Sequence, residues 1–342
     1  MNLFVVVIGS LAAGAVSWLA TAGVLRLLRS HGVLDIPNER SSHSSPTPRG
    51  GGIAVASVLL AAWLAFWLYG GKDTVADDFW IILAAGAALA LISWVDDVRG
   101  SLPAIVRLGV QAIAVGAGLF ALPEGGGVFQ GALPPALDLA VSGLIWLWFL
   151  NLFNFMDGID GIAGSQATSA GLGLFALAII FPAAAGLGAY GLTLAAVALG
   201  FLPWNWQPAR IFLGDVGSVP LGYAIGWLLL SLATFGLWQA ALLLVLYFVA
   251  DASFILVRRL TRGEPIWRAH HQHFYQVAVA AGRSHAHVVL AVTIVNLLLA
   301  GLALATTLSA SFAWGALGAG LLLTVALLCY LRLSQNRPTH AD

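Results

Sequence analysis

This 342-residue sequence has very little charge, because only 9% of its residues are Asp, Glu, Lys or Arg and its single lysine is Lys72. A soluble domain typically carries roughly 25% charged residues, so an ordinary soluble enzyme is excluded. The 15 basic residues balance 15 acidic ones, which removes the net positive charge expected of a DNA-binding protein. The only cysteine, Cys329, excludes a disulfide framework and a cysteine-based metal cluster.

Apolar residues are abundant instead: 60% of the chain is hydrophobic and the mean hydropathy is +0.92, which also excludes a disordered chain. A membrane-spanning helix needs about 20 apolar residues. Segments of that length occur at about 3–28, 52–70, 78–95, 103–122, 134–153, 164–182, 184–203, 217–235, 237–257, 286–307 and 310–332. We therefore expect an all-α, polytopic membrane bundle of about eleven transmembrane helices, forming one domain over 1–335 with a tail at 336–342.

The basic residues are distributed unequally between the two sets of loops that eleven spans create. All 14 arginines fall in one set or at the helix ends that border it, whereas the other set holds only Lys72. Positively charged loops face the cytoplasm. We therefore expect a periplasmic N-terminus and a cytoplasmic C-terminus, with the Arg-rich loops in the cytoplasm.

Polar residues gather at the cytoplasmic ends of the expected spans. Asp96 and Asp97 close the span that ends LISWVDD. Adjacent carboxylates at a membrane boundary are costly unless they share a cation or a proton. The alternative is a solvated helix end.

Four polar side chains recur every three residues in NLFNFMDGIDG: Asn151, Asn154, Asp157 and Asp160. One unbroken helix would spread them over half its circumference, whereas a break at the glycines directs them into one pocket. Helix capping by an aspartate is the alternative, but it does not account for all four residues.

Two further clusters follow. Asn205, Arg210 and Asp215 precede or begin a span, and Asp215 in LGDVGS is either a helix cap or a metal ligand. The loop after residue 257 holds a cluster of arginines and histidines, namely Arg258, Arg259, Arg262, Arg268, His270, His271 and His273. This composition predicts an anion-binding loop better than a zinc site, since the HEXXH motif and cysteine ligands are missing. Asp251 precedes that loop and could pair with an arginine, line the pocket or orient the histidine loop; a structural ion pair is the favoured interpretation.

Carboxylates that can hold Mg²⁺ together with arginines and histidines that bind phosphate indicate a membrane enzyme that handles a diphosphate. The alternative is a polytopic transporter with an acidic and histidine-rich cytoplasmic gate. That alternative is weaker, because transporters place such groups near the midplane and often in repeated halves.

These motifs resemble those of the polyprenyl-phosphate N-acetylhexosamine-1-phosphate transferases, also called glycosyltransferase family 4, which include phospho-MurNAc-pentapeptide translocase. The similarity runs in order through SSHSSPTPRGGG, WVDD, NFMDGIDG, FLGDVGS and RAHHQHF. It implies a phosphotransferase that moves a sugar 1-phosphate from a UDP-N-acetyl sugar to undecaprenyl phosphate, releases UMP and requires Mg²⁺ or Mn²⁺. It also implies location in the bacterial inner membrane, and it is compatible with a homodimer.

The resemblance also assigns roles to residues of this sequence. Catalytic roles go to Asp96, Asp97, Asp215, His270, His271 and His273. The nucleotide-binding positions match Asn154, Asp157 and Asn205, and the positions that face the sugar match Asn151 and Asp160. Basic substrate contacts match Arg40, Arg49 and Arg268. The magnesium ligands are expected to be Asp215 and Asp157.

Two departures from the family pattern bear on the expected chemistry, the first arguing against a three-carboxylate mechanism and the second against MurNAc-pentapeptide as the sugar. A third acid found in some members is replaced here by Gly100, and R-A-H-H-Q-H replaces the H-H-H-x-E of the pentapeptide translocases. The first loop is most similar to enzymes that initiate O-antigen in lipopolysaccharide synthesis. The resemblance therefore implies UDP-GlcNAc or a 6-deoxy relative such as UDP-FucNAc or UDP-QuiNAc.

Overall fold

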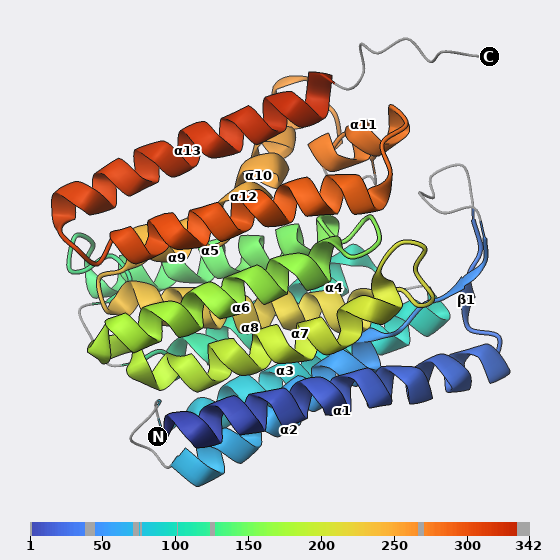
Figure 1. Cartoon of the computed structure of the whole chain (residues 1–342), viewed down its shortest axis with the longest axis horizontal. Coiled ribbons are helices and arrows are strands. Elements are labelled where there is room, and N and C mark those ends of the chain that lie inside the picture. The colour runs from blue at the N-terminus through green and yellow to red at the C-terminus, as the bar shows by residue number, and fades with distance from the viewer. Residues whose placement is uncertain are drawn as a thin grey trace.

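The long apolar runs form helices, since a helix pairs its backbone polar groups internally and lipid offers no other partner. The computed structural model describes residues 2–37, 45–70, 75, 77–100, 102–123, 127–265 and 270–333. The elements, shown in Figure 1, are α1 (Leu3–Ser30), β1 (Leu34–Asp35), β2 (Thr47–Pro48), α2 (Gly52–Gly70), α3 (Phe79–Arg99), α4 (Ala104–Gly118), η1 (Leu119–Ala121), α5 (Pro135–Phe155), α6 (Ile162–Ile180), η2 (Pro182–Leu187), α7 (Gly188–Asn205), α8 (Asp215–Thr234), α9 (Trp238–Leu243), α10 (Leu246–Thr261), α11 (Phe274–Ala280), α12 (His285–Ala305) and α13 (Ala310–Arg332). The expected all-α membrane fold is confirmed, and the tail at 336–342 lies outside the described residues.

Ten helical segments of the described chain are long and apolar enough to cross a membrane. They correspond to ten of the eleven expected spans. The division near Gly186 and Gly188 is present, because η2 separates α6 from α7. The turn expected at Gly236 is also present, with a φ of 83° at that glycine.

The expected span 237–257 differs, because it consists of the short helix α9 and the separate helix α10, which meet at Leu244 and Val245. Hydropathy reports the cost of transfer into lipid and not the continuity of a helix. The break leaves a backbone carbonyl without its helical partner, and the side-chain amide of Gln166 in α6 donates to that oxygen on Leu244 at 2.9 Å.

The helices run lengthwise in the bundle, and α1 begins at the end opposite to the one where α13 finishes (Figure 1). A chain that runs through the bundle an odd number of times begins and finishes at opposite ends of it. The pair α9 and α10 together therefore takes the place of the eleventh span. Which end faces the cytoplasm stays a prediction.

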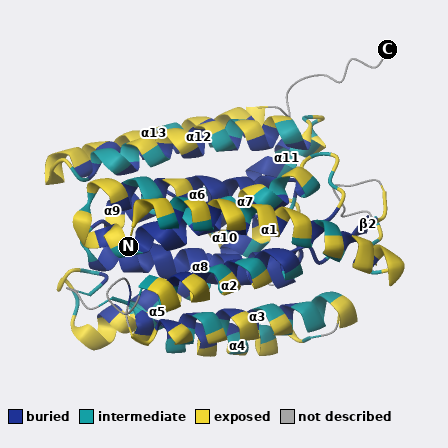
Figure 2. Cartoon of the chain, turned by 60° about the horizontal axis from the view of Figure 1, so that its bottom comes forward, coloured by how far each residue is buried: buried dark blue, intermediate teal, exposed yellow. Residues whose placement is uncertain are grey.

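Helix α8 lies at the centre of the bundle, and every residue from Val216 to Thr234 is buried. Helices α2, α3 and α5 pack against it. The outer helices α1, α3, α4 and α13 carry many exposed residues, yellow in Figure 2, and these include the apolar residues Leu11, Leu91, Ile113 and Leu322. Exposed apolar residues on the outer surface are expected for a protein whose surroundings are lipid and not water.

A buried amide pair stabilises the break between α9 and α10. Gln166 donates to the Leu244 carbonyl and accepts from Asn296 Nδ2 of α12 at 2.9 Å. Both side chains are at most 1% exposed. We expect Gln166→Met to lower the free energy of unfolding by about 1–3 kcal/mol, since it leaves a carbonyl and an amide unpaired. Thermal unfolding of the protein in detergent measures this effect.

Thr168→Val is the matched control, since Thr168 is also buried in α6 but bonds only the carbonyl of Gly164 in its own helix. Equal melting temperatures for the Gln166 and Thr168 variants would contradict a role for the amide pair at the break.

Candidate active site

The loop before α2 is joined to the loop before α8 by backbone hydrogen bonds. The N–H of Phe212 donates to Pro48 O at 2.8 Å, and the N–H of Gly51 donates to Phe212 O at 2.8 Å. These bonds set Arg49 beside Asp215, although the two residues are far apart in the sequence. A motif in the loop between α1 and α2 and a motif at the start of α8 thus form one structure.

The first turns of α2 and α8 are in close contact. A Cβ added at Gly52 would overlap the backbone of Gly217. Glycine at both positions permits this approach, which places the start of α8 directly against the PTPRGGG loop.

Arg49 connects two carboxylates through a single nitrogen. Its Nη2 donates to Asp97 Oδ1 at 2.9 Å and to Asp215 Oδ1 at 2.8 Å. The Asp97 side chain is 2% exposed, and its other oxygen accepts from the N–H of Val216 at 2.9 Å. Asp97 therefore holds Arg49 and the start of α8, and it is shielded from solvent.

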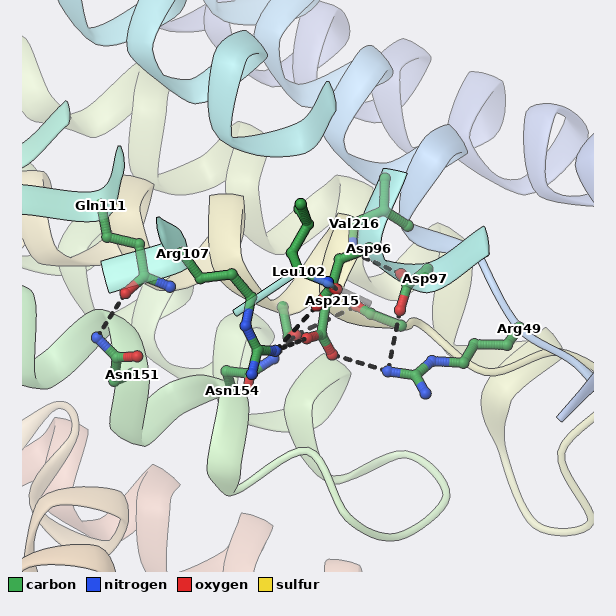
Figure 3. Close-up of polar contacts among 12 residues, drawn as sticks. Arg49, Asp96, Asp97, Leu102, Arg107, Gln111, Asn151, Asn154, Asp215 and Val216 are labelled. Atoms are coloured by element: carbon green, nitrogen blue, oxygen red, sulfur yellow. Dashed lines mark hydrogen bonds and ion pairs between the residues drawn. The ribbon is translucent and has the colours of Figure 1, made fainter. Parts of the chain in front are cut away.

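Arg107 of α4 approaches Asp215 from the other side. Its Nη1 lies 2.9 Å from Asp96 Oδ2 and 3.6 Å from Asp215 Oδ2. The second oxygen of Asp96 accepts from the N–H of Leu102 at 3.0 Å. Figure 3 shows Asp215 between the two guanidinium groups. We call Arg49, Asp96, Asp97, Arg107 and Asp215 the acid–arginine cluster.

A cavity of about 370 Å³, which we call the polar pocket, opens on one side of this cluster. Its wall combines carboxylates, amides, an arginine and histidines from the five helices α5, α7, α8, α11 and α12, strand β1 and the neighbouring loops. The lining residues are Asp35, Arg49, Asn154, Asp157, Gly158, Ile159, Asp160, Asn205, Phe212, Leu213, Gly214, Asp215, Ser218, His271, Gln276 and His285. This lining suits a polar, phosphorylated molecule.

A second cavity of about 230 Å³, the interhelical pocket, lies between α3, α4 and α5. Its other lining residues are apolar, and the polar ones are Ser93, Asp96, Arg107, Gln111, Asn151, Asn154 and Asp215. Both pockets include Asn154 and Asp215 in their walls. The two cavities therefore meet at Asp215.

Asn154 lies in the last turn of α5, and Asp157 lies in the loop that follows. Asn154 donates from Nδ2 to Ser218 Oγ at 2.7 Å, so its Oδ1 is directed elsewhere. Burial and the negative charge of Asp215 raise the pKa of Asp157 well above its usual value. The aspartates of NFMDGIDG and FLGDVGS therefore interact electrostatically.

Asp160 and Asn205 line the polar pocket, yet both use their side chains to hold backbone. Asn205 accepts from the N–H of Gly161 at 2.9 Å and donates to Ile211 O at 3.0 Å. Asp160 accepts from the N–H of Ala209 at 3.1 Å. These bonds join the loop after α5 to the loop before α8 and shape the pocket.

Asn151 was expected to face the sugar together with Asp160, but it lines the interhelical pocket, whereas Asp160 lines the polar pocket. Its Nδ2 donates to Gln111 Oε1 at 2.9 Å. The three-residue spacing turns Asn151 away from Asp160, because α5 is continuous up to Phe155 and breaks only afterwards.

The three histidines expected near the diphosphate occupy different environments. Only His271 lines the polar pocket. His273 is 4% exposed and lies 2.9 Å from Asp251 Oδ1 through its Nδ1. Burial, with His273 and Arg259 nearby, lowers the pKa of His270 to about 4, so it is neutral at pH 7. Arg40 and Arg268 lie outside the described residues.

Several pocket residues were not anticipated from the sequence. These are Asp35, Arg107, Gln111, Ser218, Gln276 and His285. A charged residue inside an apolar span marks a functional position, and Gln111 follows Arg107 by one helical turn. This signal identifies both residues. His285 contacts Asp160, with Nδ1 3.4 Å from Oδ2, but nothing in its local sequence indicates that contact.

No group of three or more His, Cys, Asp or Glu side chains that could hold a metal ion occurs among the described residues. A Mg²⁺ ion needs fewer protein ligands, because it is typically held by one or two carboxylates, water and phosphate oxygens. Asp157 and Asp215 in the wall of the polar pocket provide such oxygens. The donor set therefore fits Mg²⁺ when the substrate supplies the remaining ligands.

The chain is similar to known membrane transferases. The profile of glycosyl transferase family 4 matches residues 79–233. A decaprenyl-phosphate N-acetylglucosaminephosphotransferase of Mycobacterium tuberculosis is 30% identical over 321 residues, covering 82% of this chain and 77% of the relative. A probable undecaprenyl-phosphate N-acetylglucosaminyl 1-phosphate transferase of Bacillus subtilis is 28% identical, covering 80% and 77%. An undecaprenyl-phosphate alpha-N-acetylglucosaminyl 1-phosphate transferase of Yersinia pestis is 26% identical, covering 79% and 75%.

Proposed function

This chain belongs to glycosyl transferase family 4, and from that premise we propose that it transfers an N-acetylhexosamine 1-phosphate from a UDP-sugar to undecaprenyl phosphate. It is a multi-pass membrane sugar-phosphate transferase. We propose the bacterial inner membrane as its location, with the acid–arginine cluster facing the cytoplasm, since the Arg-rich loops lie on that side by the positive-inside rule.

The observation that carries the proposal is the position of Asp215 in the wall of both pockets. A transferase must bring two substrates into contact, and each pocket suits one of them. The polar pocket suits the UDP-sugar. The interhelical pocket, with Arg107 and apolar residues in its wall, suits the phosphate and first isoprene units of the lipid. The shared wall is where the two would react.

A separate apolar groove lies against α5. The groove has a volume of about 470 Å³ and is lined by α5, α8, α9 and α10. Trp148 of the groove and Phe155 of the interhelical pocket have ring centroids 6.4 Å apart. We propose that a polyprenyl chain attached to a phosphate near Arg107 runs past these two rings of α5 toward the groove.

We propose direct displacement. An oxygen of the lipid phosphate forms a bond to the β-phosphorus of the UDP-sugar, and the bond from that phosphorus to the bridging oxygen breaks and releases UMP. Arg107 and Arg49 hold the two negatively charged substrates close together, and Asp96 and Asp97 orient these arginines. A phosphate monoester is largely ionised near pH 7, so the acids need not remove a proton. Positioning and charge stabilisation dominate, as in other phosphoryl transfers.

We propose that Asp157 and Asp215 hold Mg²⁺ in the polar pocket. When bound, the ion would supply positive charge to the diphosphate of the UDP-sugar. This assignment is supported by the chemistry of the donors, because both are hard carboxylate oxygens in the wall of the polar pocket. Mn²⁺ prefers similar ligands.

The names of the relatives favour GlcNAc as the sugar, and the first-loop sequence is compatible with the 6-deoxy sugars FucNAc and QuiNAc. We propose one of these three sugars and a role in initiating O-antigen or another envelope polysaccharide. The family match favours this function over a transporter.

We expect UMP release from membranes that contain this protein, undecaprenyl phosphate, Mg²⁺ and the correct UDP-N-acetyl sugar. Release should require the lipid and the cation, because both substrates and the ion meet at Asp215. Chromatography of UMP and of the lipid-linked product measures the reaction, and a panel of UDP-GlcNAc, UDP-FucNAc and UDP-QuiNAc identifies the sugar.

Membranes without the protein provide the background. Release of UDP instead of UMP would show transfer of the sugar without its phosphate and would contradict the proposed displacement. The absence of any nucleotide product from folded protein would favour the transporter.

A further inference from the structure

Asp251 of α10 is completely buried, with 0% exposure, although it lines neither of the two pockets that meet at Asp215. A buried carboxylate is costly unless hydrogen bonds surround it. Four contacts meet this need: His273 Nδ1 at 2.9 Å, the N–H of Phe274 at 3.1 and 3.3 Å from the two oxygens, and the hydroxyl of Tyr247 at 3.2 Å. Two of its three partners belong to the start of α11.

The segment that Asp251 holds forms part of the polar pocket. His271 precedes His273 by two residues, and Gln276 follows it in the first turn of α11; both line the pocket. Tyr275, fully buried, donates from its hydroxyl to Phe155 O at 3.1 Å, where α5 ends and the NFMDGIDG loop begins.

A second bond from α10 reaches the same segment. Arg258 Nη2 donates to Gln272 Oε1 at 2.8 Å. His271 is itself exposed, so its place at the pocket depends on how the residues after it are held. The carboxylate of Asp251 holds the side chain of His273 and the main chain of Phe274 together.

We propose that Asp251 is a positioning residue: it fixes residues 270–276 against the polar pocket and thereby sets His271 and Gln276 where the UDP-sugar binds. The inference rests on the proposed function. In this proposal α10, which is separated from α9 by the break at Leu244, provides the residue that holds the histidine segment in place.

A double-mutant cycle tests the coupling. Asp251→Ala should lower kcat/KM for the UDP-sugar about tenfold, the effect expected from losing a charge-assisted hydrogen bond. In a His271→Ala background the same change should cost much less, since the group that Asp251 positions has gone. Asp251→Asn keeps an oxygen for the N–H of Phe274 and should recover part of the loss. Equal factors in both backgrounds would overturn the proposal.

Hydrogen exchange gives a readout that does not depend on catalysis. The amides of Phe274, Tyr275 and Gln276 should exchange faster in the Asp251→Ala protein, whereas Tyr247→Phe should leave them unchanged, because it keeps the bonds to His273 and Phe274. Unchanged exchange in Asp251→Ala would overturn the proposal even if the protein proved inactive with every UDP-sugar. If the alanine variant fails to fold, Asp251→Asn takes its place: it removes the charge and one of the two oxygens that face the N–H of Phe274, so the same amides should exchange faster by a smaller factor, and unchanged exchange would again overturn the proposal.

Discussion

Asp215→Asn should reduce kcat by about 10²–10³-fold, the range seen when one preorganised electrostatic group is removed from an active site. The asparagine keeps the shape of the side chain and removes its charge. Arg49 and Arg107 then lose a shared partner, and the proposed Mg²⁺ ligands lose a carboxylate. UMP release at increasing Mg²⁺ concentration measures both effects, and we expect the remaining activity to need more Mg²⁺.

Asp78→Asn is the matched control. Asp78 is exposed and stands just before the first residue of α3, whereas Asp96 and Asp97 lie in the last turn of the same helix. Its activity should equal that of the unmodified protein. Full activity and an unchanged Mg²⁺ requirement in Asp215→Asn would refute both the metal assignment and the central role of the residue.

Arg107→Met should raise KM for undecaprenyl phosphate by about 10–100-fold and leave KM for the UDP-sugar nearly unchanged, given the strength of hydrogen bonds to charged groups. The reason is the position of Arg107 in the interhelical pocket and its absence from the lining of the polar pocket. The change also leaves Asp96 without its cation, so the carboxylate would repel the lipid phosphate. Steady-state kinetics with each substrate varied in turn measure the two constants.

Arg49→Met should have the opposite effect and raise KM for the UDP-sugar. Of the two pockets, Arg49 lines the polar pocket but not the interhelical pocket. Arg99→Met, an exposed charge at the end of α3, serves as the neutral control. If both arginine variants changed the two KM values equally, the assignment of one substrate to each pocket would be wrong.

Most of the bundle could be predicted because the insertion of a helix into lipid depends mainly on the composition of its own residues. Ten expected spans are continuous helices within the described chain. The span at 237–257 could not be predicted in detail, because its break is supported by Gln166 of a different helix. Contacts of that kind leave no trace in local hydropathy.

The gathering of the aspartate motifs could also be predicted, since each motif ends or begins a span on the same side. Asp96, Asp97 and Asp215 meet as expected. The counter-charges were only partly foreseen: Arg49 was expected as a substrate contact, whereas Arg107, in the first turn of α4, was given no role. Both arginines reach Asp215 only because the loop before α2 and helix α4 pack beside α8.

The sequence by itself determined the membrane class, the number of apolar segments and the chemistry of the residues at their ends, because these depend on composition and short spacing. Only the tertiary structure decided which carboxylate pairs with which arginine, that Asn151 and Asp160 line different pockets, and that His271 alone of His270, His271 and His273 lines the polar pocket. The reason is physical: a side chain's partners are set by the packing of helices distant in sequence, and that packing also determines which polar groups are buried.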